Sequence, residues 1–264
     1  MRYHFTARVA VILKEGLEAA ADALALYHLA QQMPSTDTNV KLVKVGITIL
    51  DVCNNAERCV VLFGNRSDGA AIALKRLTNA DEVERLSHLV GLNLSHRGLV
   101  PFEFCSPLND FLLMPRYIST LTELKPLTDE RQGLLVTQMK AALQYLHGKG
   151  VAHMDVKPDN IAMNVAGEFI LIDIGNAAPF ETLTDVTSMF VPDGFTIVRG
   201  QLAASSHADF CQLAMTLLAK LDFSYIQTRK TLRLSPQAAL NALRTIGCVV
   251  CESLSELIGN GSSV

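Results

Sequence analysis

The sequence lacks both an excess of charge of one sign and any long apolar run. Its formal net charge is −3 at pH 7, which gives no reason to expect binding to nucleic acid or to a charged membrane surface. Asp22 interrupts the longest apolar run near the start, well short of the ~20 residues that a membrane span needs. Val9–Leu13 is cut off by Lys14-Glu15 and makes a poor signal peptide. We therefore expect a cytoplasmic protein without a membrane span.

The cysteines show no pattern of a disulfide-rich secreted protein. The six cysteines are scattered along 264 residues, which favours reduced thiols in an intracellular protein. Cys248 and Cys251 have the spacing of half a metal site, but neither a second pair nor a nearby His accompanies them, so we interpret them as buried structural residues. Hydrophobic residues make up 49% and charged residues 19%, a globular composition that fits one large domain or two lobes.

The residues that could take part in chemistry are concentrated between His153 and Gly175. Asp155 is followed by Lys157 and Asn160, and Asp173 comes directly after the apolar run Phe169–Ile172. The pattern predicts a loop, a tight hairpin turning near Ala166-Gly167 and a buried strand that ends at a glycine. It would bring two separate carboxylates, a lysine and an amide to one site.

Phosphoryl transfer gives this spacing a reason, because the protein mainly has to position groups and neutralise charge. Asp155 can accept the proton of an attacking hydroxyl, and Lys157 lies on the same side of an extended loop, where it can meet the transferred phosphate. Asn160 and Asp173 carry the hard oxygen ligands that Mg²⁺ prefers.

These residues resemble the eukaryotic-type protein kinase family. Its H-R-D-L-x-x-x-N loop is present as His153-Met154-Asp155-Val156-Lys157-Pro158-Asp159-Asn160, and its D-F-G as Asp173-Ile174-Gly175. The resemblance implies that Asp155 is the catalytic base, Lys157 the phosphate-contacting lysine, and Asn160 and Asp173 the metal ligands. It also implies an α+β, two-lobed fold, ATP and Mg²⁺ as cofactors, and a Ser or Thr hydroxyl of a protein as the acceptor.

The residues expected to bind the nucleotide lie mainly in residues 40–117. Three strands are expected at Val43–Val52, Arg58–Phe63 and Ala70–Leu77, with a hairpin over Gly64–Gly69. By the resemblance, Lys75 contacts the α- and β-phosphates, Ala73 lies over the adenine, Met114 guards the back of the adenine pocket, and Arg116 and Tyr117 belong to the hinge. The glycine-rich loop is missing, since Asp51–Glu57 contains no glycine, and we therefore expect weakened or unusual nucleotide binding.

The remaining elements follow the same order. A helix is expected over Asn79–Gly91, where either Glu82 or Glu84 would pair with Lys75, and strands over Gly98–Cys105 and Phe111–Arg116. Thr128 marks the start of a long helix that ends near Gly148. Asp209 opens a helix, and by the resemblance it supports the catalytic loop. Two short helices are expected around Pro236–Leu243 and Cys248–Leu257.

We expect an N-terminal helical extension over residues 1–39, a small lobe over 40–117 and a shortened large lobe over 118–264. The helix over Glu15–Met33 packs on the small lobe or recruits a regulatory partner. Met154 replaces the arginine that binds a phosphorylated activation loop, so activity should not require that phosphorylation. Three alternatives to a protein kinase remain: a nucleotide-binding pseudokinase scaffold, a small-molecule kinase of related fold, and a protein that acts through its N-terminal helix.

Overall fold

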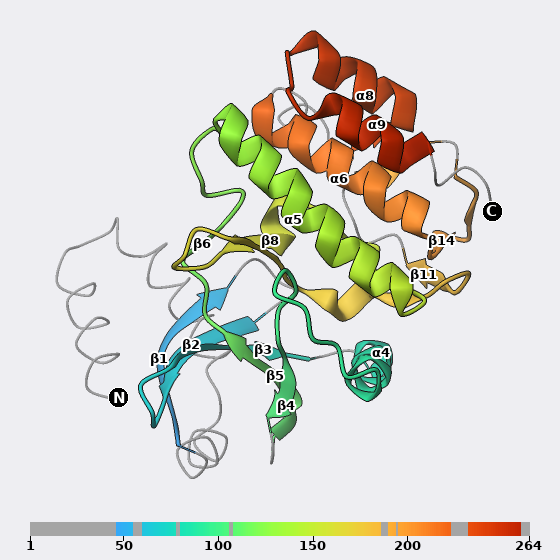
Figure 1. The fold of residues 1–264 in the computed structure, drawn as a ribbon. Helices are drawn as coiled ribbons and strands as arrows, with labels where there is room; N and C mark the ends of the chain where they lie inside the picture. Colours follow the sequence, from blue (N-terminus) through green and yellow to red (C-terminus); the bar gives the residue numbers. More distant parts are fainter. Residues whose placement is uncertain are drawn as a thin grey trace, which may run out of the picture. The chain divides into compact units, whose positions relative to one another are not determined.

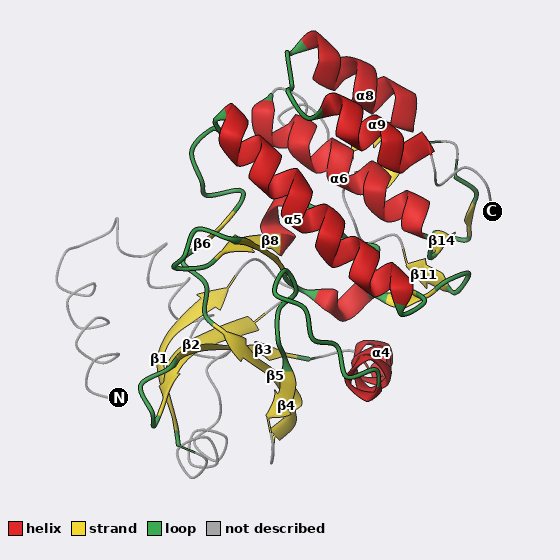
Figure 2. Ribbon diagram, viewed as in Figure 1, coloured by secondary structure: helices red, strands yellow, loops and turns green. Residues whose placement is uncertain are grey.

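Strands dominate the first part of the described chain and helices the second (Figures 1 and 2). The computed structural model describes residues 46–54, 60–77, 80–105, 108–185, 190–193, 195–222 and 232–259. By contact density the chain forms two units. Unit 1 holds residues up to Ala80 and Phe102–Arg116, and unit 2 holds Asp81–Pro101 and residues from Tyr117 onward. The expected α+β fold is confirmed, whereas the domain limits stay a prediction.

Unit 1 contains a five-stranded sheet of order β1-β2-β3-β5-β4 in which every neighbouring pair is antiparallel. Along β1, Ile47 and Ile49 are buried while Thr48 and Leu50 are exposed, the alternation of a strand with one face on a core. The strands are β1 (Ile47–Asn54), β2 (Val60–Arg66), β3 (Ala71–Arg76), β4 (Glu103–Cys105) and β5 (Leu108–Pro115).

Two sequence predictions for these strands need correction. β2 continues to Arg66, so Gly64 lies inside the strand and not in the hairpin loop. A Cβ at Gly64 would overlap the Thr48 carbonyl oxygen of β1, which explains why a glycine is placed there. The strand expected over Gly98–Cys105 is confined to β4, because the residues before it form a turn and an isolated bridge from Leu99 to Leu171.

The core of unit 2 is built around helices α5 and α6, which lie side by side (Figure 1). Both start at a side-chain cap: Thr128 accepts from Arg131 N before α5, and Ser205 accepts from Ala208 N before α6. The predicted start and end of α5 are confirmed, and the two expected C-terminal helices are present. The four helices are α5 (Asp129–Gly148), α6 (Ser206–Leu221), α8 (Pro236–Thr245) and α9 (Cys251–Gly259).

Short strand pairs connect these helices. The predicted hairpin near Gly167 is confirmed as β8 and β9, and β6 adds a third strand to it. The other pairs are β7 with β10, β11 and β13 on either side of β14, and the parallel pair β12 with β15. The strands are β6 (Ser119–Thr120), β7 (Val151–Ala152), β8 (Ile161–Met163), β9 (Phe169–Leu171), β10 (Ala178–Pro179), β11 (Leu183–Asp185), β12 (Phe190–Pro192), β13 (Ile197–Val198), β14 (Gln201–Ala203) and β15 (Leu232–Leu234).

Helix α4 (Ala80–Gly91) confirms the helix expected over Asn79–Gly91, and almost all of it groups with unit 2. The turn that follows it is tied to β9, because Leu171 N donates to Gly98 O at 2.8 Å and Val100 N donates to Leu171 O at 2.9 Å. The segment after α4 is therefore fixed to the strand that leads to Asp173.

Among the described residues no helix is long and apolar enough to cross a membrane. The expected N-terminal extension, including the helix over Glu15–Met33, lies outside the described residues. Cys248 and Cys251 are both buried, as expected, and the Cys251 thiol donates to Leu240 O at 3.3 Å. Burial raises the pKa of both thiols, which disfavours the thiolate.

Candidate active site

The loop from His153 to Lys157 has no regular secondary structure, yet its residues up to Val156 are buried. Its backbone polar groups therefore need partners other than a helix or sheet ladder. Asp209 of α6 supplies two of them, since its Oδ2 accepts from His153 N and its Oδ1 from Met154 N, both at 2.8 Å. The carboxylate is fully buried and also contacts His147 Nε2 at 2.8 Å. Asp209 thus supports the loop as predicted.

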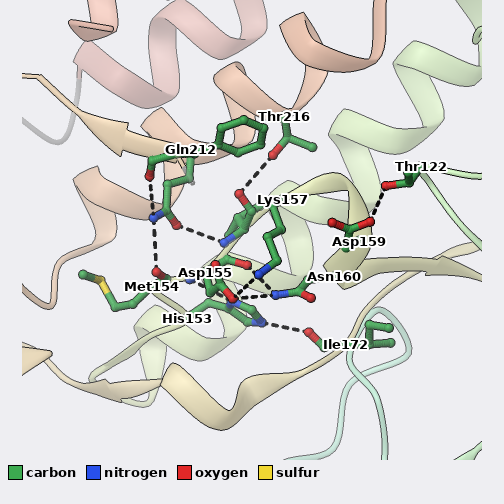
Figure 3. Close-up of polar contacts among 12 residues, drawn as sticks. Thr122, His153, Met154, Asp155, Lys157, Asp159, Asn160, Ile172, Gln212 and Thr216 are labelled. Carbon is green, nitrogen blue, oxygen red and sulfur yellow. Dashed lines mark hydrogen bonds and ion pairs between the residues drawn. The ribbon is translucent and has the colours of Figure 1, made fainter. Parts of the chain in front are cut away.

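Two further residues of α6 hold the same loop, and the sequence pattern had not pointed to either. Gln212 accepts from Val156 N at 2.9 Å and donates to Met154 O at 3.1 Å, while Thr216 donates to Val156 O at 3.0 Å (Figure 3). Residues 209, 212 and 216 follow the three- and four-residue spacing of one helix face. That spacing, counted from Asp209, is the signal that could have revealed them.

Asp155, Lys157 and Asn160 converge as predicted (Figure 3). Asp155 Oδ2 accepts from Lys157 Nζ at 2.8 Å and from Asn160 Nδ2 at 2.9 Å. The other carboxylate oxygen, Oδ1, is buried and has no hydrogen-bond partner among the described residues. A buried acceptor without a donor costs free energy, so Oδ1 is placed to accept a hydrogen bond from an incoming group.

Asp173 is tied to this loop through the residue before it. Ile172 N donates to Asn160 O at 2.8 Å, and His153 Nε2 lies 3.1 Å from Ile172 O. The two candidate metal ligands, Asn160 and Asp173, therefore stand on neighbouring backbone segments. Both offer hard oxygens, because the Asn160 amide nitrogen is already committed to Asp155 and leaves the amide oxygen for a ligand.

Asp173 itself has left-handed backbone angles (φ 55°, ψ 65°). This conformation is unfavourable for a residue with a Cβ and persists where the surroundings hold it in place. Residues 174–176 then form one 3₁₀ turn, closed by Ala177 N donating to Ile174 O at 3.0 Å. The backbone around the candidate metal ligand is thus fixed on both sides.

Four of the predicted nucleotide-binding residues belong to unit 1. Ala73 on β3 pairs with Met114 on β5 and with Phe63 on β2, which places one small and two larger apolar side chains on adjacent strands. The Arg116 guanidinium lies over the Phe63 ring at 4.3 Å, and Arg116 N donates to Ala71 O. Lys75 follows two residues after Ala73 on β3 and is half-buried.

Tyr117 is the first residue of unit 2 after the hinge. Burial raises the pKa of Tyr117 to about 12, so its phenol stays protonated at neutral pH. The meeting of Lys75 and its neighbours with Asp155, Lys157, Asn160 and Asp173 around one nucleotide stays a prediction.

The two candidate acids of α4 differ in their surroundings. Glu84 is exposed, whereas Glu82 is half-buried with its carboxylate against Gly175. A Cβ at Gly175 would overlap Glu82 Oε1, so the glycine allows α4 to approach this segment closely. Glu82 is therefore the acid that faces the candidate metal-binding segment.

Met154 lies in an apolar cluster and not at a charged surface. Its side chain is 6% exposed and packs with other buried apolar residues. The cluster is formed by Met154, Ala152, Ala178, Leu202, Ala204 and Ala208. Ala178, in the segment after Asp173, thus packs in one apolar cluster with the Met154 thioether, at the position where the family pattern has a cationic arginine.

The sequence model of the protein kinase domain family matches residues 59–197 of this chain. The chain belongs to the protein kinase domain family. A serine/threonine-protein kinase D from Synechocystis sp. is 33% identical over 97 residues, which are 35% of this chain and 19% of that protein. A probable serine/threonine-protein kinase HAL5-like from Eremothecium gossypii is 31% identical over 122 residues, 46% of this chain and 17% of the relative.

Mitogen-activated protein kinase 12 from Danio rerio is 32% identical over 133 residues, 43% of this chain and 36% of the relative. The chain thus spans well under half the length of these curated relatives. Membership confirms the resemblance carried by His153–Gly175, and a protein kinase domain uses ATP together with a divalent metal. Which residues of this chain bind them belongs to the proposal below.

Proposed function

We propose that the chain is a protein serine/threonine kinase that transfers the γ-phosphate of ATP to a protein hydroxyl. The observation that carries the proposal is the pairing of Asp155, Lys157 and Asn160, which leaves Asp155 Oδ1 buried and without a donor from the described part of the chain. A hydroxyl group that donates to Oδ1 would supply the missing hydrogen bond and would be oriented for attack.

In the proposed reaction the acceptor oxygen forms a bond to the γ-phosphorus while the bond from that phosphorus to the bridging oxygen of ADP breaks. Asp155 Oδ1 takes the hydroxyl proton. Lys157 Nζ, held 2.8 Å from Asp155 Oδ2, contacts the transferred phosphoryl group. Asn160 and Asp173 would hold Mg²⁺, which neutralises phosphate charge when bound.

The nucleotide side rests on unit 1 in this proposal. Lys75 contacts the α- and β-phosphates, with Glu82 as its acidic partner, since Glu84 is exposed. Ala73 and Met114, which are paired across β3 and β5, line the adenine. The backbone around Arg116 and Tyr117 hydrogen-bonds the adenine edge.

The test is a turnover measurement with labelled ATP, Mg²⁺ and generic protein substrates. We expect Asp155→Asn to lower kcat by roughly a thousandfold, because the proton acceptor is lost. Asp68→Asn, a matched change at the exposed loop between β2 and β3, should leave kcat unchanged. Equal turnover of the wild type and Asp155→Asn would refute the proposal.

A nucleotide-binding scaffold is the alternative that one observation favours, namely the absence of glycine from Asp51–Glu57. It predicts nucleotide binding without turnover in the same assay. A screen of small hydroxyl compounds would detect a small-molecule kinase, and a pull-down with and without residues 1–38 would detect a partner of the N-terminal helix. The expected lack of nucleic-acid binding and the expected location in the cytoplasm stay predictions, and imaging of the tagged chain tests the latter.

A further inference from the structure

Helix α4 contacts the Asp173-Ile174-Gly175 segment through a residue that the proposed mechanism does not use. Arg85 Nε donates to Gly175 O at 3.0 Å, a bond between residues 90 positions apart. Arg85 is half-buried, and a guanidinium in this setting makes a stronger, charge-assisted hydrogen bond than a neutral donor. The bond joins α4 to the backbone two residues after the candidate metal ligand.

Helix α4 makes a second contact with Gly175. Glu82 lies one helical turn before Arg85, on the same face of α4, and its carboxylate occupies the space where a Cβ of residue 175 would be. Glu82 thus packs against Gly175 while Arg85 holds its carbonyl oxygen. The missing Cβ of Gly175 leaves room for the Glu82 carboxylate, and the carbonyl oxygen of the same residue accepts the Arg85 bond.

The end of α4 is also hydrogen-bonded to the strand that precedes Asp173. The turn after α4 is hydrogen-bonded to β9 through Gly98, Val100 and Leu171, and β9 leads directly to Asp173. Helix α4 is therefore attached to the backbone before Asp173 and, through Arg85, to the backbone after it. Asp173 lies between these attachments in a left-handed conformation, which needs such support.

We propose that Arg85 is a positioning residue: by holding Gly175 O it fixes the backbone on which the Asp173 carboxylate is presented to the metal. The inference rests on the proposed function in that it takes Asp173 as a metal ligand. Arg85 touches neither nucleotide nor metal in this proposal and acts through the 174–176 turn. Its loss should therefore weaken metal-dependent nucleotide binding and spare metal-independent binding.

The experiment is a direct titration of the full chain with a fluorescent, non-hydrolysable ATP analogue, with Mg²⁺ and with EDTA. We expect Arg85→Gln to raise the Kd measured with Mg²⁺ by about tenfold, since a charge-assisted hydrogen bond is lost. The Kd measured in EDTA should not change, and the urea midpoint should fall only slightly, by the loss of one hydrogen bond. Arg85→Lys, which keeps a cationic donor, should recover part of the affinity, and Arg244→Gln, at an exposed arginine of α8, should match the wild type.

An unchanged Kd of Arg85→Gln in Mg²⁺ would overturn the proposal. An equal rise in Mg²⁺ and in EDTA with a lower urea midpoint would also overturn it, because Arg85 would then only stabilise the fold. The proposal fails too if the wild type binds the analogue equally well with Mg²⁺ and with EDTA. If the wild type fails to phosphorylate substrates but Arg85→Gln still removes the Mg²⁺ effect, the proposed function fails while the role of Arg85 stands.

Discussion

The catalytic loop of unit 2 and the β1–β2 connection of unit 1 match the kinase family to very different degrees. The loop carries Asp155, Lys157 and Asn160. Five hydrogen bonds from the side chains of Asp209, Gln212 and Thr216 hold its backbone. The end of β1 and the connection that follows it carry no glycine between Asp51 and Glu57, where the family places backbone against phosphate.

The difference separates two requirements of the reaction. Groups that move a proton or bind a metal must be of one chemical type and in one place, and Asp155 and Asn160, which are proposed for these roles, lie on a loop that α6 holds by hydrogen bonds. Groups that hold the nucleotide share their task with many contacts, so one of them can be lost at a lower cost. We therefore expect large effects from changes near the loop and small ones near the β1–β2 connection.

The largest effect is expected at Asp209. Asp209→Ala leaves two backbone N–H groups and the ring of His147 without their buried acceptor, and it should lower the free energy of unfolding by about 3–5 kcal/mol. Urea denaturation measures this loss. Asp209→Asn keeps one acceptor oxygen and should lose about half as much; a loss below about 1 kcal/mol for the alanine variant would show that the loop is supported elsewhere.

A smaller effect is expected at Met154, where the loop departs from the family. Met154→Arg drives a cation into a cluster of alanines and Leu202 and should cost about 2–4 kcal/mol of unfolding free energy. Met154→Leu, which keeps the volume, should cost less than about 1.5 kcal/mol. Urea denaturation of both variants measures the difference.

The same apolar packing supports the expectation that phosphatase treatment leaves wild-type activity unchanged. Loss of activity after that treatment, restored by rephosphorylation, would contradict it. A Met154→Arg variant with wild-type stability would show that the cluster tolerates a charge. The packing of Met154 would then no longer support the expectation about phosphorylation.

The smallest effect is expected where β1 ends and its connection to β2 begins. Replacing Asn54 and Asn55 together by glycine should tighten nucleotide binding by about threefold, or about 0.6 kcal/mol, since backbone could then approach the phosphates. Isothermal titration with an ATP analogue measures the change. Asn93→Gly is the matched control, because Asn93 is exposed and already has a positive φ of 49°; wild-type affinity equal to that of ordinary kinases would contradict the prediction.

The sequence was sufficient where local chemistry decides the structure. Thr128 predicted the start of α5 because a hydroxyl cap has a fixed distance to the helix, and Ala166-Gly167 predicted the turn of the β8–β9 hairpin. Asp155, Lys157 and Asn160 were found through their spacing in one loop. The structure then brought them within hydrogen-bonding distance of one another.

The sequence was insufficient where packing decides. The support from Gln212 and Thr216 depends on which face of α6 meets the loop, and the bond from Arg85 to Gly175 joins segments 90 residues apart. The place of Gly64 inside β2 depends on the close approach of Thr48. The contacts of Arg85 and Gly64 have no local pattern, and the helical spacing of Gln212 and Thr216 from Asp209 gains its meaning only once α6 is known to meet the loop.

Asp209 has a consequence for anyone who searches for inactive variants of this chain. A single buried carboxylate joins the end of α5, the start of α6 and the loop that carries Asp155, so its removal should abolish turnover as completely as removal of Asp155, the proposed proton acceptor. A genetic screen would rank the two aspartates together. Only the amount of folded protein that each variant leaves in the cell would distinguish a collapsed loop from an intact loop that lacks the proposed base.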